Sequence, residues 1–238
     1  MERTHFEEEL RGLQAGLNEL ADLAAGRLDA ALLALFERRV DLARQVIAGD
    51  ALLTDLQKAL DARAMRVFAL QQPAARDLRL VLAVMKAGSD LERIGDHAVN
   101  IAQTVVVIQA FPSIPTEAAL HRMGQMSVDM LREAVSAFQE GDVGLARRVL
   151  AADHDVDEAR RDVFRHLLEH IHRSSPETEP CVNLMLVSRN LERVADLATN
   201  IAEDAIFLVS ARDVRHMADL QAAVNDAVAT GPPGAAPQ

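Results

Sequence analysis

Thirteen residues recur one hundred positions apart, and this internal repeat constrains the fold more than any other feature of the sequence. The first copy reads DLERIGDHAVNIA from Asp90 to Ala102, and the second reads NLERVADLATNIA from Asn190 to Ala202. Leu, Glu, Arg, Asp, Ala, Asn, Ile and Ala hold the same places in both copies, which is too long a match for shared composition to explain. The chain is therefore predicted to be a duplication of one structural unit.

Each copy has the spacing of an amphipathic helix. Apolar residues follow one another at steps of three and four, as they do along the buried side of a helix. The stripe comprises Leu91, Ile94, Ala98, Ile101 and Val105 in the first copy, and Leu191, Val194, Ala198 and Ile201 in the second. Comparable spacing predicts further helices over residues 5–37, 40–48, 50–70, 116–139, 143–151 and 153–172. No segment shows the sustained alternation of a strand.

The sequence thus predicts an all-α protein made of two pseudo-symmetric three-helix bundles. The first repeat is expected to occupy residues 1–112 and the second residues 113–212. Residues 213–238 are expected to add a short helix and a flexible tail, because they end in GPPGAAPQ.

Composition excludes several classes of partner. The net charge is −11, aromatic residues make up 3% of the chain, and Trp and Tyr are absent, so the sequence lacks a basic or stacking surface for nucleic acid. Apolar runs such as Val105 to Ile108 are far too short to insert into a membrane. Cys181 is the single cysteine, and the first residues lack the pattern of a secretion signal. A cytoplasmic location is therefore expected.

The repeated helix also carries polar residues at four-residue spacing, which places them along one side. Carboxylate and amide oxygens are hard ligands that suit magnesium, calcium, manganese or iron. A second helix must complete such a site, and the acidic segment around residues 153–157 is a candidate. The predicted metal ligands are Glu92, Asp96, Asn100, Glu192, Asp196, Asn200, Asp153 and Asp157. Neighbours that could join them are Asp90, His97, Glu203 and Asp204.

Two other interpretations of these residues remain open. Arg93 and Arg193 stand three residues before Asp96 and Asp196, a spacing that permits ordinary surface ion pairs. A purely structural helical adaptor would then have solvated acidic surfaces. Alternatively, the chain is a di-metal carboxylate enzyme or a metal store of the helical-bundle type, although its Glu-x-x-His spacing at 169–172 falls at a helix end.

The sequence shows no common catalytic motif, so no enzyme activity is expected. Gly-rich phosphate loops, Walker patterns and Gly-x-Ser-x-Gly are absent from the sequence. Cys181 has no histidine near it in sequence, and a packed thiol is therefore favoured over a nucleophile.

The doubled Leu-Glu-Arg-x-x-Asp motif, with an Asn four residues further on, resembles the PhoU family of phosphate-transport regulators. The segment QQPAARDLR at 71–79, just before the first copy, and the turns at Asp50 and Asp153 support the resemblance, which covers about residues 5–210. It implies a cytosolic accessory of the phosphate-specific ABC transporter. Such a protein helps to keep the membrane sensor histidine kinase inactive when phosphate is plentiful, and is thus a negative regulator of the phosphate regulon.

The resemblance also implies metal clusters on the Glu-x-x-x-Asp faces, which here are Glu92 with Asp96 and Glu192 with Asp196. Asn100 and Asn200 are the implied supporting residues, and the ion would be divalent or trivalent: iron, zinc, manganese or magnesium. The repeats differ where Thr54 stands opposite Asp157 and Leu197 opposite His97, so their metal content is expected to differ. Because long amphipathic bundles often leave an exposed apolar seam, a homodimer is also expected.

Overall fold

The computed structural model describes residues 2–112, 114, 118–173 and 175–211, and these residues form helices and no strand. The expected all-α fold is confirmed. The predicted helix and tail at 213–238 lie outside the described residues. The elements are α1 (Glu2–Phe36), α2 (Val40–Ala48), α3 (Asp50–Gln71), α4 (Ala75–Ile108), α5 (Ala118–Glu140), α6 (Val143–Arg173), the 3-10 turn η1 (Ser175–Glu177) and α7 (Thr178–Ser210).

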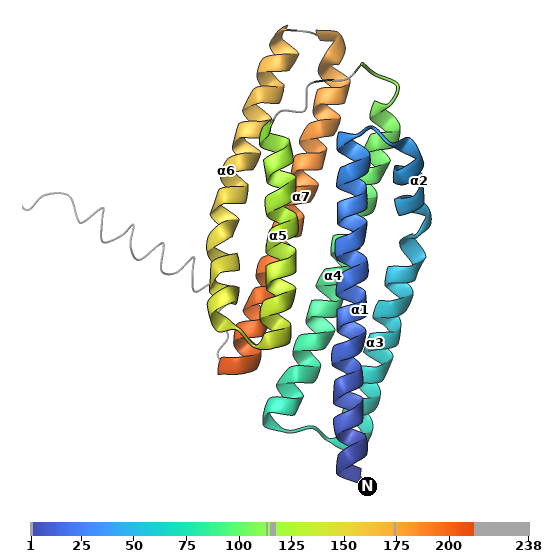
Figure 1. Ribbon diagram of the computed structural model, residues 1–238, viewed down its shortest axis with the longest axis vertical. Helices are drawn as coiled ribbons and strands as arrows, with labels where there is room; N and C mark the ends of the chain where they lie inside the picture. Colours follow the sequence, from blue (N-terminus) through green and yellow to red (C-terminus); the bar gives the residue numbers. More distant parts are fainter. Residues whose placement is uncertain (1, 113, 115–117, 174, 212–238) are drawn as a thin grey trace, which may run out of the picture.

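Two bundles of long helices lie side by side (Figure 1). In the first, α1 and α3 pack against α4, and in the second, α5 and α6 pack against α7. The bundles meet chiefly where α4 and α7 run antiparallel along each other, with a smaller contact between α1 and α5. The two copies of the repeated motif therefore face each other at the centre of the molecule.

The apolar stripe of each copy is buried, as its spacing predicts. Every member of the stripe in α4 and in α7 is at most 1% exposed. Burying each Leu, Ile or Val of the stripes contributes about 1.5–3 kcal/mol. The stripes thus anchor α4 and α7 in the core and leave the polar sides of both helices to face neighbouring helices or solvent.

The repeats differ in the helix that precedes the motif. The sequence predicts a break near residue 152, and this prediction is wrong, because α6 runs unbroken from Val143 to Arg173. In the first repeat Gly49 separates α2 from α3, whereas the equivalent position holds Ala152. The buried guanidinium of Arg27 donates a hydrogen bond to the Gly49 carbonyl and so stabilises the break. Met130 stands at the position equivalent to Arg27, so the second repeat lacks this donor.

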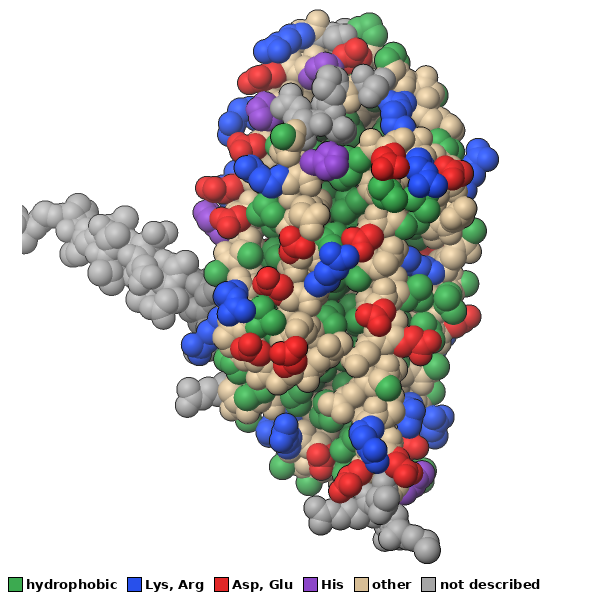
Figure 2. Space-filling view, in the orientation of Figure 1, with side chains coloured by type: hydrophobic (Ala, Val, Ile, Leu, Met, Phe, Trp, Pro, Cys, Tyr) green, Lys and Arg blue, Asp and Glu red, His purple; other side chains and the backbone are tan. Residues whose placement is uncertain are grey.

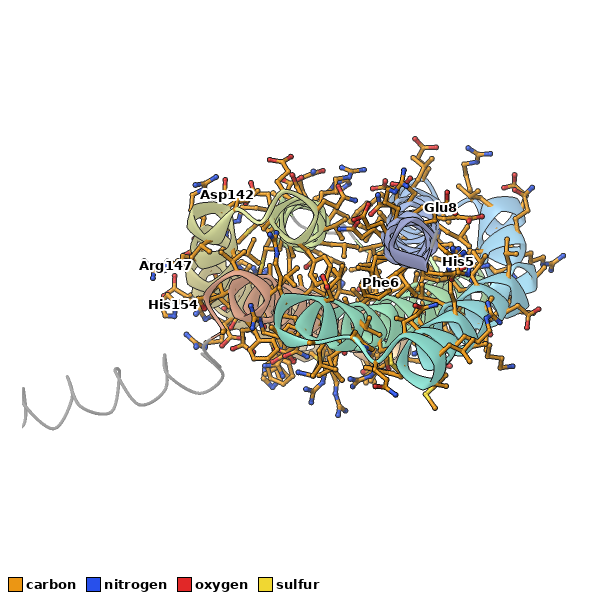
Figure 3. All side chains as sticks on the ribbon, turned by 90° about the horizontal axis from the view of Figure 1, so that it is seen from below. His5, Phe6, Glu8, Asp142, Arg147 and His154 are labelled. Atoms are coloured by element: carbon orange, nitrogen blue, oxygen red, sulfur yellow. The ribbon has the colours of Figure 1, made fainter. Side chains whose placement is uncertain are left out.

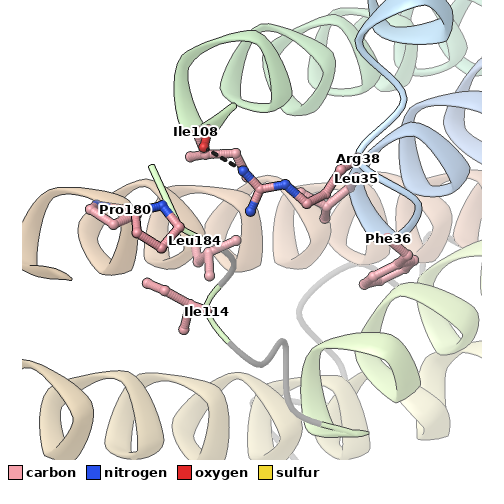
Figure 4. Close-up of a pocket in the computed structure, with 8 residues that line it drawn as sticks. Leu35, Phe36, Arg38, Ile108, Ile114, Pro180 and Leu184 are labelled. Carbon is pink, nitrogen blue, oxygen red and sulfur yellow. Dashed lines mark hydrogen bonds between the residues drawn. The ribbon is translucent and has the colours of Figure 1, made fainter. Parts of the chain in front are cut away.

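A second arginine joins the end of α1 to the end of α4 (Figure 4). Arg38 has a left-handed backbone, with φ 54°, which ends α1 and turns the chain toward α2. Its guanidinium donates hydrogen bonds to the carbonyls of Ile108 at 3.0 Å and Phe111 at 2.8 Å. A cation here is favourable because it lies beside the carbonyl oxygens at the C-terminal end of α4.

Close approach of α3 to α4 depends on Gly95. A Cβ atom at Gly95 would stand 2.5 Å from Leu53 Cδ1 on α3. In the second repeat the equivalent pair is Val156 and Ala195, so a smaller aliphatic side chain accompanies the added methyl group. Volume is thus conserved between the repeats.

We expect Gly95→Ala to lower the free energy of unfolding by about 1–3 kcal/mol, because Leu53 is 1% exposed and has no free space to enter. Gly26→Ala is the matched control, since nothing lies within 4 Å of its added methyl group and alanine gains up to about 1 kcal/mol in a helix. Urea unfolding followed by circular dichroism measures both. Equal stabilisation by the two substitutions would contradict the packing described.

Candidate metal-binding faces

Four carboxylates of the second repeat gather where α6 faces α7, and we call this group the second acidic face: Asp153, Asp157, Glu192 and Asp196. Burial raises the pKa of Asp153, and repulsion from the other three members raises it further. The fold therefore brings close together four residues that the sequence grouped as metal ligands. Such a group favours the binding of a cation.

Arginines neutralise part of this face. Arg160 Nε lies 3.2 Å from a Glu192 oxygen, and Arg193 donates to Asp196 at 3.0 Å. The ion-pair interpretation of Arg193 is therefore correct, but Arg93 pairs with Asp90 at 3.4 Å instead of with Asp96. Within the described residues, no three His, Cys, Asp or Glu side chains stand in an arrangement that would hold an ion. The carboxylates would have to rotate away from their arginines to do so.

The corresponding group in the first repeat, the first acidic face, consists of Asp50, Glu92 and Asp96. Thr54 donates a hydrogen bond to Glu92 at 3.2 Å and occupies the place of Asp157. Burial raises the pKa of Asp96, and the neighbouring Asp50 raises it further. Asp50 was not among the predicted ligands, although its alignment with Asp153 at an offset of 103 residues is the signal that could have identified it.

The donor sets of the two faces are unequal. The first face has one carboxylate fewer, and the buried guanidinium of Arg27 lies 3.9 Å from an Asp50 oxygen. In the second face Met130 replaces that cation, and the arginines present are exposed enough to swing into solvent. Because it has more carboxylate oxygens and no buried cation beside them, the second face fits a hard cation better than the first face does.

Asn100 and Asn200 do not lie with the acidic faces. Asn100 donates to Asn190 on α7 at 3.5 Å, and Asn200 bonds Asp90 on α4. A step of four residues overshoots a helical turn by about 40°, so the second step from Glu92 carries residue 100 round to the contact between α4 and α7. The asparagines therefore connect the repeats to each other.

Asp90, Glu203 and Asp204 also gather at this contact, in a groove of about 270 Å³. Lys86 Nζ lies 3.2 Å from an Asp204 oxygen. Burial raises the pKa of Asp90 to about 6, and Arg93 opposes this shift while Asp204 adds to it. The sequence suggests these carboxylates as additional metal ligands, but they lie in this groove and not on the two acidic faces.

The surroundings of Cys181 are those of a packed thiol, as the sequence predicts. Cys181 is fully buried, and burial raises the pKa of its thiol, which reduces the reactive thiolate. On the surface seen in Figure 2, carboxylates and cations are interspersed and form no field of one sign.

Comparison with known proteins agrees with the duplication. The profile of the PhoU domain matches residues 17–105 and again residues 120–205. The chain belongs to the PhoU family. PhoU relatives include the "phosphate-specific transport system accessory protein PhoU homolog" of Xylella fastidiosa, 34% identical with 86% of each chain covered, and that of Zymomonas mobilis, 36% identical with 88% of each covered. The PhoU of Escherichia coli is 29% identical, with 89% of this chain covered and 88% of the other.

Solved PhoU structures have the same fold. The crystal structure of PhoU from Pseudomonas aeruginosa superposes with a TM-score of 0.84 at 31% identity, covering 87% of this chain and all of the other. The "phosphate transport system regulatory protein PhoU" from Streptococcus pneumoniae gives a TM-score of 0.81 at 29% identity, covering 88% of this chain and 99% of the other. The resemblance seen in the repeated motif is thus confirmed.

The raised pKa of the half-buried Asp90 carboxyl predicts how stability depends on pH. Because its pKa is about 6 in the folded chain and about 4 when unfolded, the folded state holds the proton more tightly, and stability falls as pH rises between these values. We expect Asp90→Asn to escape this loss, so that its stability relative to the wild type rises by about 2–3 kcal/mol between pH 4 and pH 8. Asp22→Asn, which removes an exposed carboxylate, is the control. Urea unfolding at each pH measures the difference, and parallel profiles for wild type and Asp90→Asn would refute the assignment.

Proposed function

We propose that this protein is a non-enzymatic regulator that acts with the phosphate-specific ABC transporter on its cytoplasmic side. The observation that carries the proposal is the PhoU match over both repeats, together with relatives whose names describe accessory proteins of the phosphate-specific transport system. No helix in the described part of the chain is long and apolar enough to cross a membrane, so contact with a transporter would be made by docking.

The regulation that we propose is repression. The protein would hold the membrane sensor histidine kinase of the phosphate-starvation response in its inactive state while phosphate is plentiful. A docked protein shifts such an equilibrium only through its different affinity for the two states of the assembly. The long helices offer a rigid surface for this purpose, and a homodimer would present that surface twice.

Deletion of the gene tests the regulatory role. We expect a reporter of phosphate-starvation promoters to be active in high phosphate without the protein, and to be repressed again when the full chain is supplied in trans. Loss of the kinase in the same strain should restore repression, because the proposed effect passes through it. Continued repression in the deletion strain would contradict the proposal.

We further propose that the acidic faces bind a metal ion, with the second face as the stronger site. Asp153, Asp157, Glu192 and Asp196 would supply the oxygens there, and Asp50, Glu92 and Asp96 would supply those of the weaker site. The support is the crowding of carboxylates that raises the pKa of Asp153 and the absence of a counterpart to Arg27 in the second repeat. A bound divalent or trivalent cation would relieve this repulsion and join α6 to α7.

Elemental analysis of chain purified without chelator tests the metal proposal and its asymmetry. We expect Glu192→Gln with Asp196→Asn to remove most of the iron, zinc, manganese or magnesium bound. Glu92→Gln with Asp96→Asn removes the same charge from the other repeat and should remove less. Metal content that is unchanged in both double variants, or lower in the first-face variant, would count against the proposal.

A further inference from the structure

The contact between α4 and α7 carries a second groove, larger than the one around Asp90, with a volume of about 500 Å³. We call it the seam groove, and its polar lining includes His97, Asn100, Gln103, Arg189, Asn190 and Arg193. Seen along the helices, α4 and α7 lie in one row with α1 and α5 on one side, while side chains project from the other side (Figure 3). Asn100, Gln103 and Arg189 of its lining are exposed, so the groove lies outside both bundle cores.

Among the residues that the structure describes, no carboxylate lines the seam groove, although the sequence has 36 acidic residues. The groove around Asp90 has the opposite character, since three carboxylates and one lysine line it. The two grooves are equivalent by the pseudo-twofold axis that relates the repeats. The duplication has therefore produced one acidic groove and one basic groove from the same backbone.

The difference comes from substitutions that change charge, and two of them also conserve the shape of the side chain. Asn190 stands where the acidic groove has Asp90, and Gln103 stands where it has Glu203. These are amides of the same size as the carboxylates they replace. Thr104 takes the place of Asp204, and Arg189 takes the place of Ser89. These four exchanges make the seam groove more positive, whereas Leu186 in place of Lys86 removes one cation from it.

Most polar groups of the seam groove already have partners within the protein, and this leaves Arg189 as the cation available to an anion. Asn190 Oδ1 accepts bonds from His97 Nδ1 at 2.9 Å and from Asn100 at 3.5 Å, so this acceptor is already occupied. Arg193 is held by Asp196, whereas Arg189 makes no ion pair within the described part of the chain. A guanidinium presents a planar fork of donors that matches the oxygens of a phosphoryl group.

We propose that the seam groove binds the phosphoryl group of a small molecule, with Arg189 as the principal cation and Gln103 among the neutral groups that admit the anion. Its volume lies within the range of about 300–1,000 Å³ typical of small-molecule sites, so free phosphate and a nucleotide both fit. This binding goes beyond the regulatory role proposed above and is tested without the transporter or the kinase.

Isothermal titration calorimetry of the full chain with inorganic phosphate, and separately with ATP, tests the site. A chelator in the buffer prevents metal on the acidic faces from bridging to the ligand. We expect saturable binding of one ligand per chain, weakened at least about tenfold by Arg189→Ser, because a hydrogen bond to a charged group is lost. Gln103→Glu should weaken binding in the same direction through repulsion.

Arg147→Ser is the matched control, because it removes the same charge from an exposed position on α6 and should leave binding unchanged. Tighter binding of ATP than of phosphate would assign the site to a nucleotide, and equal binding would assign it to the phosphoryl group alone. Absence of saturable binding of either ligand up to about 10 mM, well beyond the affinities of specific sites, would overturn the proposal. Equal weakening by Arg147→Ser and Arg189→Ser would do so too, since the effect would then be one of net charge.

Discussion

The antiparallel packing of α4 against α7 is the interaction on which the rest of the structure depends. These helices carry the two copies of the repeated motif, and their apolar stripes are almost completely buried. On its own side α4 is held by α1, α2 and α3, and α7 is held by α5 and α6, so the α4–α7 contact unites two bundles into one body. Because the helices are antiparallel, each end of the contact combines the early part of one motif with the late part of the other.

This geometry lets a duplicated sequence make sites that are not duplicates. Equivalent positions in the two repeats have equivalent surroundings. A single substitution at such a position therefore changes the charge of the site in one repeat directly. Met130 in place of Arg27 leaves the second acidic face without a buried counterion. Asn190 in place of Asp90, with Arg189 in place of Ser89, turns one end of the α4–α7 contact from acidic to basic. Symmetry in the backbone therefore coexists with asymmetry in electrostatics.

The sequence predicted the features that rest on periodicity and repetition. The buried stripes and the all-α fold followed from spacing, and the acidic character of residues 153–157 made them the candidate to meet Glu192 and Asp196. It misplaced Asn100, because four-residue steps drift around a helix, and it predicted a break at Ala152 that only Gly49 and the Arg27 hydrogen bond produce in the other repeat. The seam groove was not anticipated, since its lining comes from two helices whose register a single sequence does not specify.

Native-state amide hydrogen exchange tests most directly whether the α4–α7 contact unites the two repeats. If it does, amides in the buried parts of both motifs should exchange only through global unfolding, with the same free energy in residues 90–102 and 190–202. That free energy should equal the stability measured by urea unfolding. Exchange of one motif through a separate opening of lower free energy, while the other stays protected, would show that the repeats are independent and would contradict this account.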